Sequence, residues 1–263
     1  MMSTEVDLIR LWRLDCEVRG ISELVIEHYE NYVREYRRDA RPLEAGALDE
    51  DPAASLSQPL DYGRLMGPPR HALRRHIPAA IDSITRGFES DPVYEWMFPN
   101  PESRPDYVQR IMTMYSEWAL QVGNAWILGD GAIGGACWVP ADVEPNAEFE
   151  STYISAAVEA NPDRSDVVIQ GLMEVGAVHP EESHWYLAAV SVVPEARGRG
   201  LGQVLLAPVL DMLDDEGVPA YLESSNTRNV PFYERLGFET QHQIRLPDGG
   251  PVMTTMWRPP STQ

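Results

Sequence analysis

A glycine-rich turn with two arginines stands between an apolar run and the start of a helical pattern. The stretch PEARGRGLGQVLL, residues 194–206, directly follows the run HWYLAAVSVV. Glycine lets the backbone approach a ligand closely, and the first N–H groups of a helix have no partner within it. The helix dipole favours negative charge at the same place, so the turn predicts a phosphate site. The residues expected to form it are Arg197, Gly198, Arg199, Gly200, Leu201 and Gly202.

Two common phosphate-binding motifs are excluded. The dinucleotide fingerprint G-x-G-x-x-G would need a third glycine at position 203, where the chain has Gln203. A Walker A loop needs a lysine, but all 21 basic residues of this chain are arginines. The pattern that fits is R-x-x-G-x-G, from Arg197 to Gly202, between an apolar strand and a helix.

A second pattern follows about thirty residues further on, in SSNTRNVPFYERLGFE. It offers Asn226 or Asn229, then Tyr233, and then Gly237 and Phe238 at the start of a strand. In this order, the two patterns resemble the signatures of the GCN5-related N-acetyltransferases (GNAT), in which the turn binds the pyrophosphate of acetyl-CoA. The stretches 124–140, 184–210 and 217–239 look most like puromycin N-acetyltransferase and its relatives. The resemblance covers residues 78–258 and is strongest after residue 184.

The resemblance implies a GNAT fold, of the α/β (α+β) class. Its mixed, mostly antiparallel sheet has about six to seven strands, is splayed at the cofactor strand and carries helices on both faces. It also implies acetyl-CoA as co-substrate and no metal. The acetyl group would pass to a primary amine of a small molecule by direct attack, through a tetrahedral intermediate. Asn226 and Asn229 are expected near the cofactor.

The chemistry of acyl transfer assigns further roles. Backbone groups of Val190 and Val192 are expected to pair with the pantetheine arm of acetyl-CoA, with one N–H facing the oxyanion. Tyr233 is the expected proton donor to the departing thiolate, because a phenol of pKa about 10 is protonated at neutral pH. Glu223 is expected at the point where the next strand diverges, where it would take the proton of the amine. Packing alone is the alternative for Tyr233, and capping or ion pairing for Glu223.

Other residues remain as alternatives for the same steps. His179 and His184, just before the cofactor strand, are alternative bases. Cys137 would be the nucleophile of a two-step mechanism, although no histidine motif accompanies it. Aromatic residues between 88 and 118 predict an enclosed mouth of the acceptor site, which residues 147–185 complete. Such a mouth favours a bulky and partly apolar amine. The alternative is that these aromatic residues form the core between helices. They are Phe88, Tyr94, Trp96, Phe98, Tyr115 and Trp118.

Two other functions stay open. An open groove at the mouth would favour a peptide or protein acceptor, and a chain without turnover on any amine would be an acyl-CoA sensor. The net charge of −20 argues against nucleic acid and anionic membranes as partners. No apolar run reaches the ~20 residues of a membrane span, and the N-terminus lacks a signal-peptide pattern. We therefore expect a cytoplasmic protein, with Cys16 and Cys137 as reduced thiols.

Composition and hydrophobic periodicity divide the chain into four parts. Residues 1–40 read as an amphipathic helical extension, which packs on the body of the protein or forms a homodimer contact. Residues 41–70 are acidic and rich in proline, glycine and alanine, as in a linker. The N-acetyltransferase domain is expected at 71–258, followed by a tail at 259–263.

Within that domain, periodicity and turn residues predict an alternation of helices and strands. Strands are expected at 71–75, at 184–193, 219–224, 238–246 and 252–258, and as a hairpin at 124–140. Helices are expected at 78–90, 105–123, 147–160, 165–177, 200–216 and 229–237, with Pro208 breaking the register of the fifth.

Overall fold

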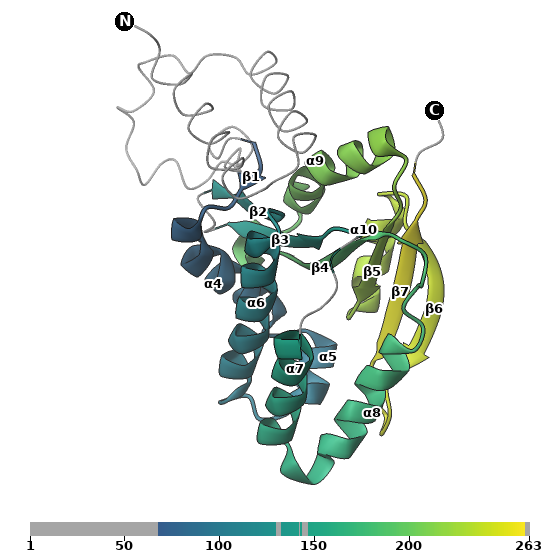
Figure 1. Ribbon diagram of the computed structural model, residues 1–263. Coiled ribbons are helices and arrows are strands. Elements are labelled where there is room, and N and C mark those ends of the chain that lie inside the picture. The colour runs from purple at the N-terminus through teal and green to yellow at the C-terminus, as the bar shows by residue number, and fades with distance from the viewer. Residues whose placement is uncertain (1–67, 130–132, 142, 144–146, 261–263) are drawn as a thin grey trace, which may run out of the picture.

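The computed structural model describes residues 68–129, 133–141, 143 and 147–260, with only the backbone at 147–150 (Figure 1). The predicted helical extension at 1–40 and its homodimer contact lie outside these residues, as do nearly all of the linker and residues 261–263. In the part of the chain that is described, no helix is long and apolar enough to cross a membrane.

A seven-stranded sheet forms the centre of the molecule, in the order β1-β2-β3-β4-β5-β7-β6. All neighbouring strands are antiparallel except β4 and β5, which are parallel. This agrees with the mixed sheet that was predicted. The strands are β1 (Arg70–His71), β2 (Ala125–Leu128), β3 (Gly134–Val139), β4 (Trp185–Val192), β5 (Ala220–Ser224), β6 (Glu239–Arg245) and β7 (Val252–Arg258).

Helices cover both faces of the sheet. On one face, α4 to α8 share a core with alternate residues of β2 and β3, and on the other face α9 and α10 do the same. Side chains alternate between the faces along a strand, so Ala125 and Ile127 belong to the first core and Trp126 and Leu128 to the second. The helices are α4 (Ile77–Phe88), α5 (Pro92–Met97), α6 (Arg104–Gln121), α7 (Ala147–Ala160), α8 (Ser165–Gly176), α9 (Leu201–Glu216) and α10 (Val230–Glu234).

Two local predictions were wrong, and one helix was missed. The first strand covers only Arg70–His71, because a 3-10 turn already begins at Arg74. The short helix α5 was not predicted; Asp91 begins it by accepting the N–H of Val93 at 2.9 Å. Helix α9 runs unbroken through Pro208, whose apolar neighbours are buried against the sheet and outweigh the one lost hydrogen bond.

A β-bulge, one extra residue in the middle of β4, changes the face of the sheet on which the following side chains lie. The register with β3 shifts between Cys137 and Trp138, which leaves Ala188 unpaired. Ala188 and Ala189 consequently lie on the same face of the sheet, although they are consecutive. Beyond this bulge, the side chain of Val190 lies on the face covered by α9.

Candidate functional site

The two parallel strands at the centre of the sheet separate soon after they begin (Figure 1). β4 and β5 pair only at Trp185 with Ala220 and at Tyr186 with Tyr221. Beyond these pairs β4 follows β3 as far as Val192, and β5 follows β7. Among the residues described, no strand pairs with β4 on this side after Tyr186. The splay predicted at this strand is therefore present.

Backbone donors of Val190 and Val192 face the open edge. The N–H of Val193 donates to the carbonyl of Ile133 at 2.9 Å, on the β3 side. N–H groups alternate between the two edges of a strand, so those of Val190 and Val192 point to the splay. The carbonyl of Val192 is engaged, because it accepts Nε of Arg197 at 3.1 Å. The two N–H groups are thus the strand donors available on this side.

The glycine turn follows β4 and leads into the 16-residue helix α9. Gly198 and Gly200 have φ values of +74° and +77°, and Gly200 is the N-cap of the helix. A Cβ at either position would meet no atom within 4 Å, so the left-handed backbone is what requires glycine there. The N-cap forms no side-chain hydrogen bond, and the first turn has no acidic residue. The helix N-terminus therefore offers its N–H groups to an anion without competition from these side chains.

The arginines of the turn also have structural contacts. The guanidinium of Arg197 donates to the carbonyls of Val192, at 3.1 Å, and Gly87, at 2.7 Å. It thereby fixes the turn to β4 and to α4. Arg199 is exposed and donates to the carbonyl of Glu195 at 3.4 Å.

Tyr233 lies on α10, in the same core cluster as Leu201 at the start of α9. Its ring packs edge-on against Phe232 and Phe238, with centroids 5.1 and 6.0 Å away. Burial, and then the carboxylate of Asp91, raise the pKa of its phenol, so Tyr233 keeps its proton at neutral pH. The structure thus places a protonated phenol within the core that contains the start of α9.

The remaining predicted contacts are near α10. A Cβ at Gly202 would lie 3.1 Å from the ring of Phe232, so this glycine lets α9 pack close to α10. Asn226 uses its side-chain oxygen to accept the N–H of Arg228 at 3.1 Å, which caps a 3-10 turn. Asn229 is exposed at the N-cap of α10, without a side-chain capping bond.

Glu223 stands where the strands part, and three side chains donate to it or face it. Its Oε2 accepts the hydroxyl of Tyr186 at 2.8 Å, across the splay. Its Oε1 accepts the hydroxyl of Tyr221 at 3.2 Å and lies 3.4 Å from Nδ1 of His179. The carboxylate side chain is 17% exposed. We call Glu223, Tyr186, Tyr221, His179 and His184 the Glu223 chamber.

A chain of phenols continues from the chamber into the helical layer. The hydroxyl of Tyr115 bonds to that of Tyr186 and lies 2.9 Å from that of Tyr153, which lies 3.3 Å from that of Tyr94. Burial raises the pKa of Tyr153 to about 12. Tyr186 must donate to an ionised Glu223, so it must accept from Tyr115, and the same direction propagates along the chain. The chain therefore orients the hydroxyl of Tyr186 toward Glu223.

The two histidines predicted as alternative bases both belong to the chamber. Their ring centroids are 5.0 Å apart, and both rings pack edge-on against Tyr221. Burial lowers the pKa of His184, so this ring is neutral at pH 7. Nδ1 of His184 is 2.6 Å from the carbonyl of Glu182, whereas His179 faces Glu223 directly.

Cys137 is not placed as a nucleophile. Its side chain is buried between the sheet and α6, with the hydroxyl of Ser116 at 3.8 Å. Burial raises the pKa of the thiol to about 12, so very little thiolate exists at neutral pH. Among the described residues, no group of three or more His, Cys, Asp and Glu side chains has a metal-binding arrangement.

The aromatic residues predicted for the mouth divide between site and core. Tyr94 and Tyr115 belong to the phenol chain. The other four lie in or against the core on the same face of the sheet: Phe88, Trp96, Phe98 and Trp118.

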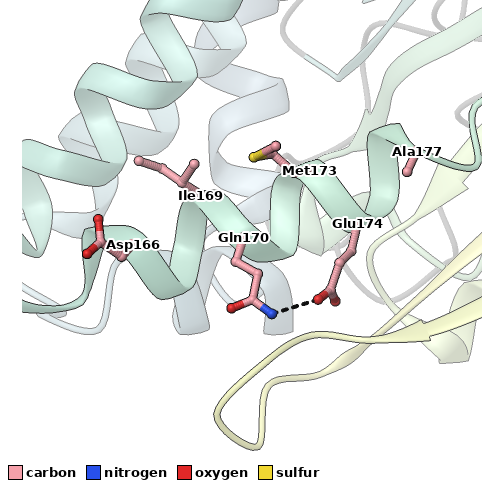
Figure 2. Close-up of a pocket in the computed structure, with 6 residues that line it drawn as sticks. All are labelled: Asp166, Ile169, Gln170, Met173, Glu174 and Ala177. Atoms are coloured by element: carbon pink, nitrogen blue, oxygen red, sulfur yellow. Dashed lines mark hydrogen bonds between the residues drawn. The ribbon is translucent and has the colours of Figure 1, made fainter.

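A surface pocket of about 420 Å³ lies along α8, with Met173 69% exposed (Figure 2). Nε2 of Gln170 donates to Glu174 at 2.8 Å within it. The pocket ends at Ala177, two residues before His179, but none of its lining residues belongs to the chamber. The lining residues are Asp166, Ile169, Gln170, Met173, Glu174 and Ala177.

Sequence reasoning missed four residues of the site. The sequence spacing could have indicated Tyr221, because it precedes Glu223 by two positions and therefore lies on the same face of the strand. The indication for Tyr186 was weaker: it is a ring with a polar hydroxyl in an otherwise apolar strand. Tyr153 and Asp91 had none, since only the packing of α7 and α5 brings them near the sheet.

A family model and a solved structure that resemble this chain are both described as acetyltransferases. The model of the Acetyltransferase (GNAT) family matches residues 90–238, which include the splay, the glycine turn, Glu223 and Tyr233. A crystal structure from Corynebacterium glutamicum, described as histone acetyltransferase HPA2 and related acetyltransferase, aligns with a TM-score of 0.55 and 24% identity. The alignment covers 74% of this chain and 97% of that protein, and it supports the fold.

Curated relatives match over a shorter stretch. An uncharacterized N-acetyltransferase of Schizosaccharomyces pombe is 41% identical over 66 residues, or 25% of this chain and 27% of the relative. A mycothiol acetyltransferase of Streptomyces griseus is 42% identical over 72 residues, or 26% of this chain and 23% of the relative. The match thus spans about a quarter of the length of each of these relatives.

Proposed function

The chain belongs to the acetyltransferase (GNAT) family, and on that premise we propose that it transfers an acetyl group from acetyl-CoA to a primary amine of a small molecule. The observation that carries this proposal is the position of Glu223. This carboxylate stands where β5 parts from β4, and it accepts a hydrogen bond from Tyr186 of β4. β4 in turn leads into the N-terminus of α9, whose N-cap is Gly200. The open edge of β4 therefore connects the acid-base group, Glu223, with the candidate anion site at the glycine turn.

The residues of the glycine turn fit the pyrophosphate of acetyl-CoA. The space beside Gly198 and Gly200 is free of neighbouring atoms within 4 Å of an added Cβ, and the first N–H groups of α9 open onto the same turn. Val190 and Val192 supply strand N–H groups for the pantetheine arm, and one of them is the oxyanion donor. Arg197 keeps the turn attached to β4.

Proton transfers are assigned to Glu223 and Tyr233. Glu223 takes the proton of the acceptor ammonium, directly or through water, so that the neutral amine attacks the thioester carbon. The carbon–sulfur bond then breaks, and Tyr233 gives its proton to the sulfur. Its raised pKa keeps the phenol protonated across the neutral range. His179 faces Glu223 and provides a way for the proton to leave toward solvent.

The acceptor is proposed to be small, because the Glu223 side chain is only 17% exposed and lies among the rings of Tyr186, Tyr221 and His179. Puromycin remains a candidate acceptor, on the strength of the sequence resemblance. The curated relatives whose names state a substrate act on mycothiol and on glucosamine 6-phosphate, both small molecules. The domain at 71–258, a cytoplasmic location and a homodimer formed through residues 1–40 also remain proposals.

The experiment is a screen of primary amines, puromycin included, with acetyl-CoA. Products are identified by mass spectrometry, and CoA release is measured with a thiol reagent. Acetylated amine and free CoA in equal amounts would support the proposal. CoA release that is independent of amine, or acetylation of peptides only, would overturn it. Tight acetyl-CoA binding without any turnover would identify an acyl-CoA sensor.

A further inference from the structure

We infer that the acceptor is an amine whose ammonium is its only charged group near the reacting nitrogen, and that amines bearing a carboxylate or phosphate there are rejected. This inference rests on the proposed function and names its substrate class. It comes from the hydrogen-bond capacity, the rings and the charge of the Glu223 chamber.

The hydrogen bonds of Glu223 leave room for one more donor. A carboxylate offers about four acceptor positions, two on each oxygen. Oε1 has Tyr221 and His179 as partners, and Oε2 has Tyr186. The remaining position is on Oε2, the oxygen on the β4 side of the splay. A primary ammonium has three N–H donors. One of them can bond to Oε2 of Glu223, and the other two remain for other acceptors around the ammonium.

Aromatic rings provide those surroundings. His179 packs edge-on against Tyr186 and Tyr221 at 5.6 and 4.7 Å, and Tyr221 lies 6.1 Å from Tyr186. His184 adds a further ring, 5.3 Å from Tyr221. Aromatic faces attract an organic cation and pack against an apolar substituent, whereas they offer no charge to an anion.

Two carboxylates, those of Glu223 and Asp91, act on this region. Besides burial, the carboxylates of Glu223 and Asp91 raise the pKa of Tyr153. The side chains that bond to Glu223 are two phenols and an imidazole, and His184 is neutral because burial lowers its pKa. A substrate carboxylate or phosphate is usually held by an arginine fork or by several N–H donors. Here it would instead stand close to the Glu223 carboxylate.

The field of the whole chain acts in the same direction. With a net charge of −20, the protein as a whole favours the approach of small cations over that of small anions that lack a dedicated site. The candidate anion site described above, the glycine turn, is reserved for the pyrophosphate in the proposed function. An acceptor with its own phosphate would compete for that turn.

The test uses amines that differ by one charged group. Tyramine is compared with tyrosine, which adds a carboxylate beside the amine, and glucosamine with glucosamine 6-phosphate. We expect kcat/KM to be at least about 100-fold higher for tyramine than for tyrosine, the effect of placing like charges close together at low dielectric. In Glu223→Gln the overall rate falls, but the ratio between the two amines should shrink at least about tenfold. Equal or better use of tyrosine or glucosamine 6-phosphate would overturn the inference.

Calorimetric binding of the same amines to the CoA-bound protein separates this inference from the proposed function. Preferred binding of tyramine that is weakened in Glu223→Gln, without turnover of any amine, would refute amine acetylation and support the inference. Failure of both tyramine and glucosamine to bind and to react would overturn the inference itself. The variant Tyr107→Phe, which removes a phenol outside the chamber, is the control for general effects of substitution.

Discussion

Replacing Gly200 by valine should weaken acetyl-CoA binding through the backbone. Gly200 has a φ of +77°, and a Cβ there meets no protein atom within 4 Å. The substitution therefore creates conformational strain and not a clash. An L-residue in the left-handed region costs about 1–2 kcal/mol, and a β-branched residue is especially unfavourable there. The turn is expected to relax, which re-aims the first N–H groups of α9.

A matched control exists at the other end of the same helix. Gly217 is the C-cap of α9, has a φ of +69° and is equally free of neighbouring atoms. Gly217→Val should cost a similar free energy of unfolding without touching the candidate cofactor site. Loss of one hydrogen bond to a charged phosphate costs about 1.5–3 kcal/mol, which is about 10- to 150-fold in Kd.

The assay combines calorimetric titration of acetyl-CoA with urea unfolding of both variants. We expect equal losses of stability, and a Kd raised at least about tenfold in Gly200→Val only. Unchanged affinity in a folded Gly200→Val protein would remove the turn from the cofactor site. Equal loss of affinity in both variants would show that general destabilisation of α9, and not the turn, is responsible.

Three shorter predictions concern the chemistry. Tyr233→Phe should lower kcat by ~10²-fold at saturating substrates with unchanged acetyl-CoA affinity; a change below threefold would leave Tyr233 with a packing role. Tyr186→Phe removes a hydrogen-bond donor to Glu223, so kcat/KM should fall at least about tenfold; an unchanged kcat/KM would contradict a role for the phenol chain. Cys137, with a pKa raised to about 12, should resist iodoacetamide at about pH 8 in the native protein and react after unfolding, as followed by peptide mass spectrometry. Native labelling would restore it as a candidate nucleophile.

Local patterns were sufficient to predict most of the fold. Alternation and turn residues gave the positions of β4, β5, β6 and β7, because a glycine or proline stands close to at least one end of each strand. The predictions failed where tertiary packing decides. Helix α9 continues through Pro208 because its apolar neighbours are held against the sheet. The six-residue helix α5 has too few residues for a periodic signal.

The site was predictable only in part, for a geometrical reason. The glycine turn is contiguous in sequence, so its residues and spacing could be recognised together. The Glu223 chamber is assembled from β4, β5 and the segment before β4, and the phenol chain adds α5, α6 and α7. Nothing in the spacing of Tyr94, Tyr115 and Tyr153 shows that their hydroxyl groups meet. The bulge at Ala188, which re-aims β4, has no sequence signal either.

The central claim is that Glu223 receives the proton of the acceptor amine. Its most direct measurement is kcat/KM for one accepted amine in the wild type and in Glu223→Gln, from neutral pH up to the pKa of the amine. The account predicts a loss of ~10²–10⁴-fold at neutral pH, which narrows as the pH rises, because more of the amine then arrives without its proton. A Glu223→Gln enzyme within threefold of wild type at neutral pH would contradict the account.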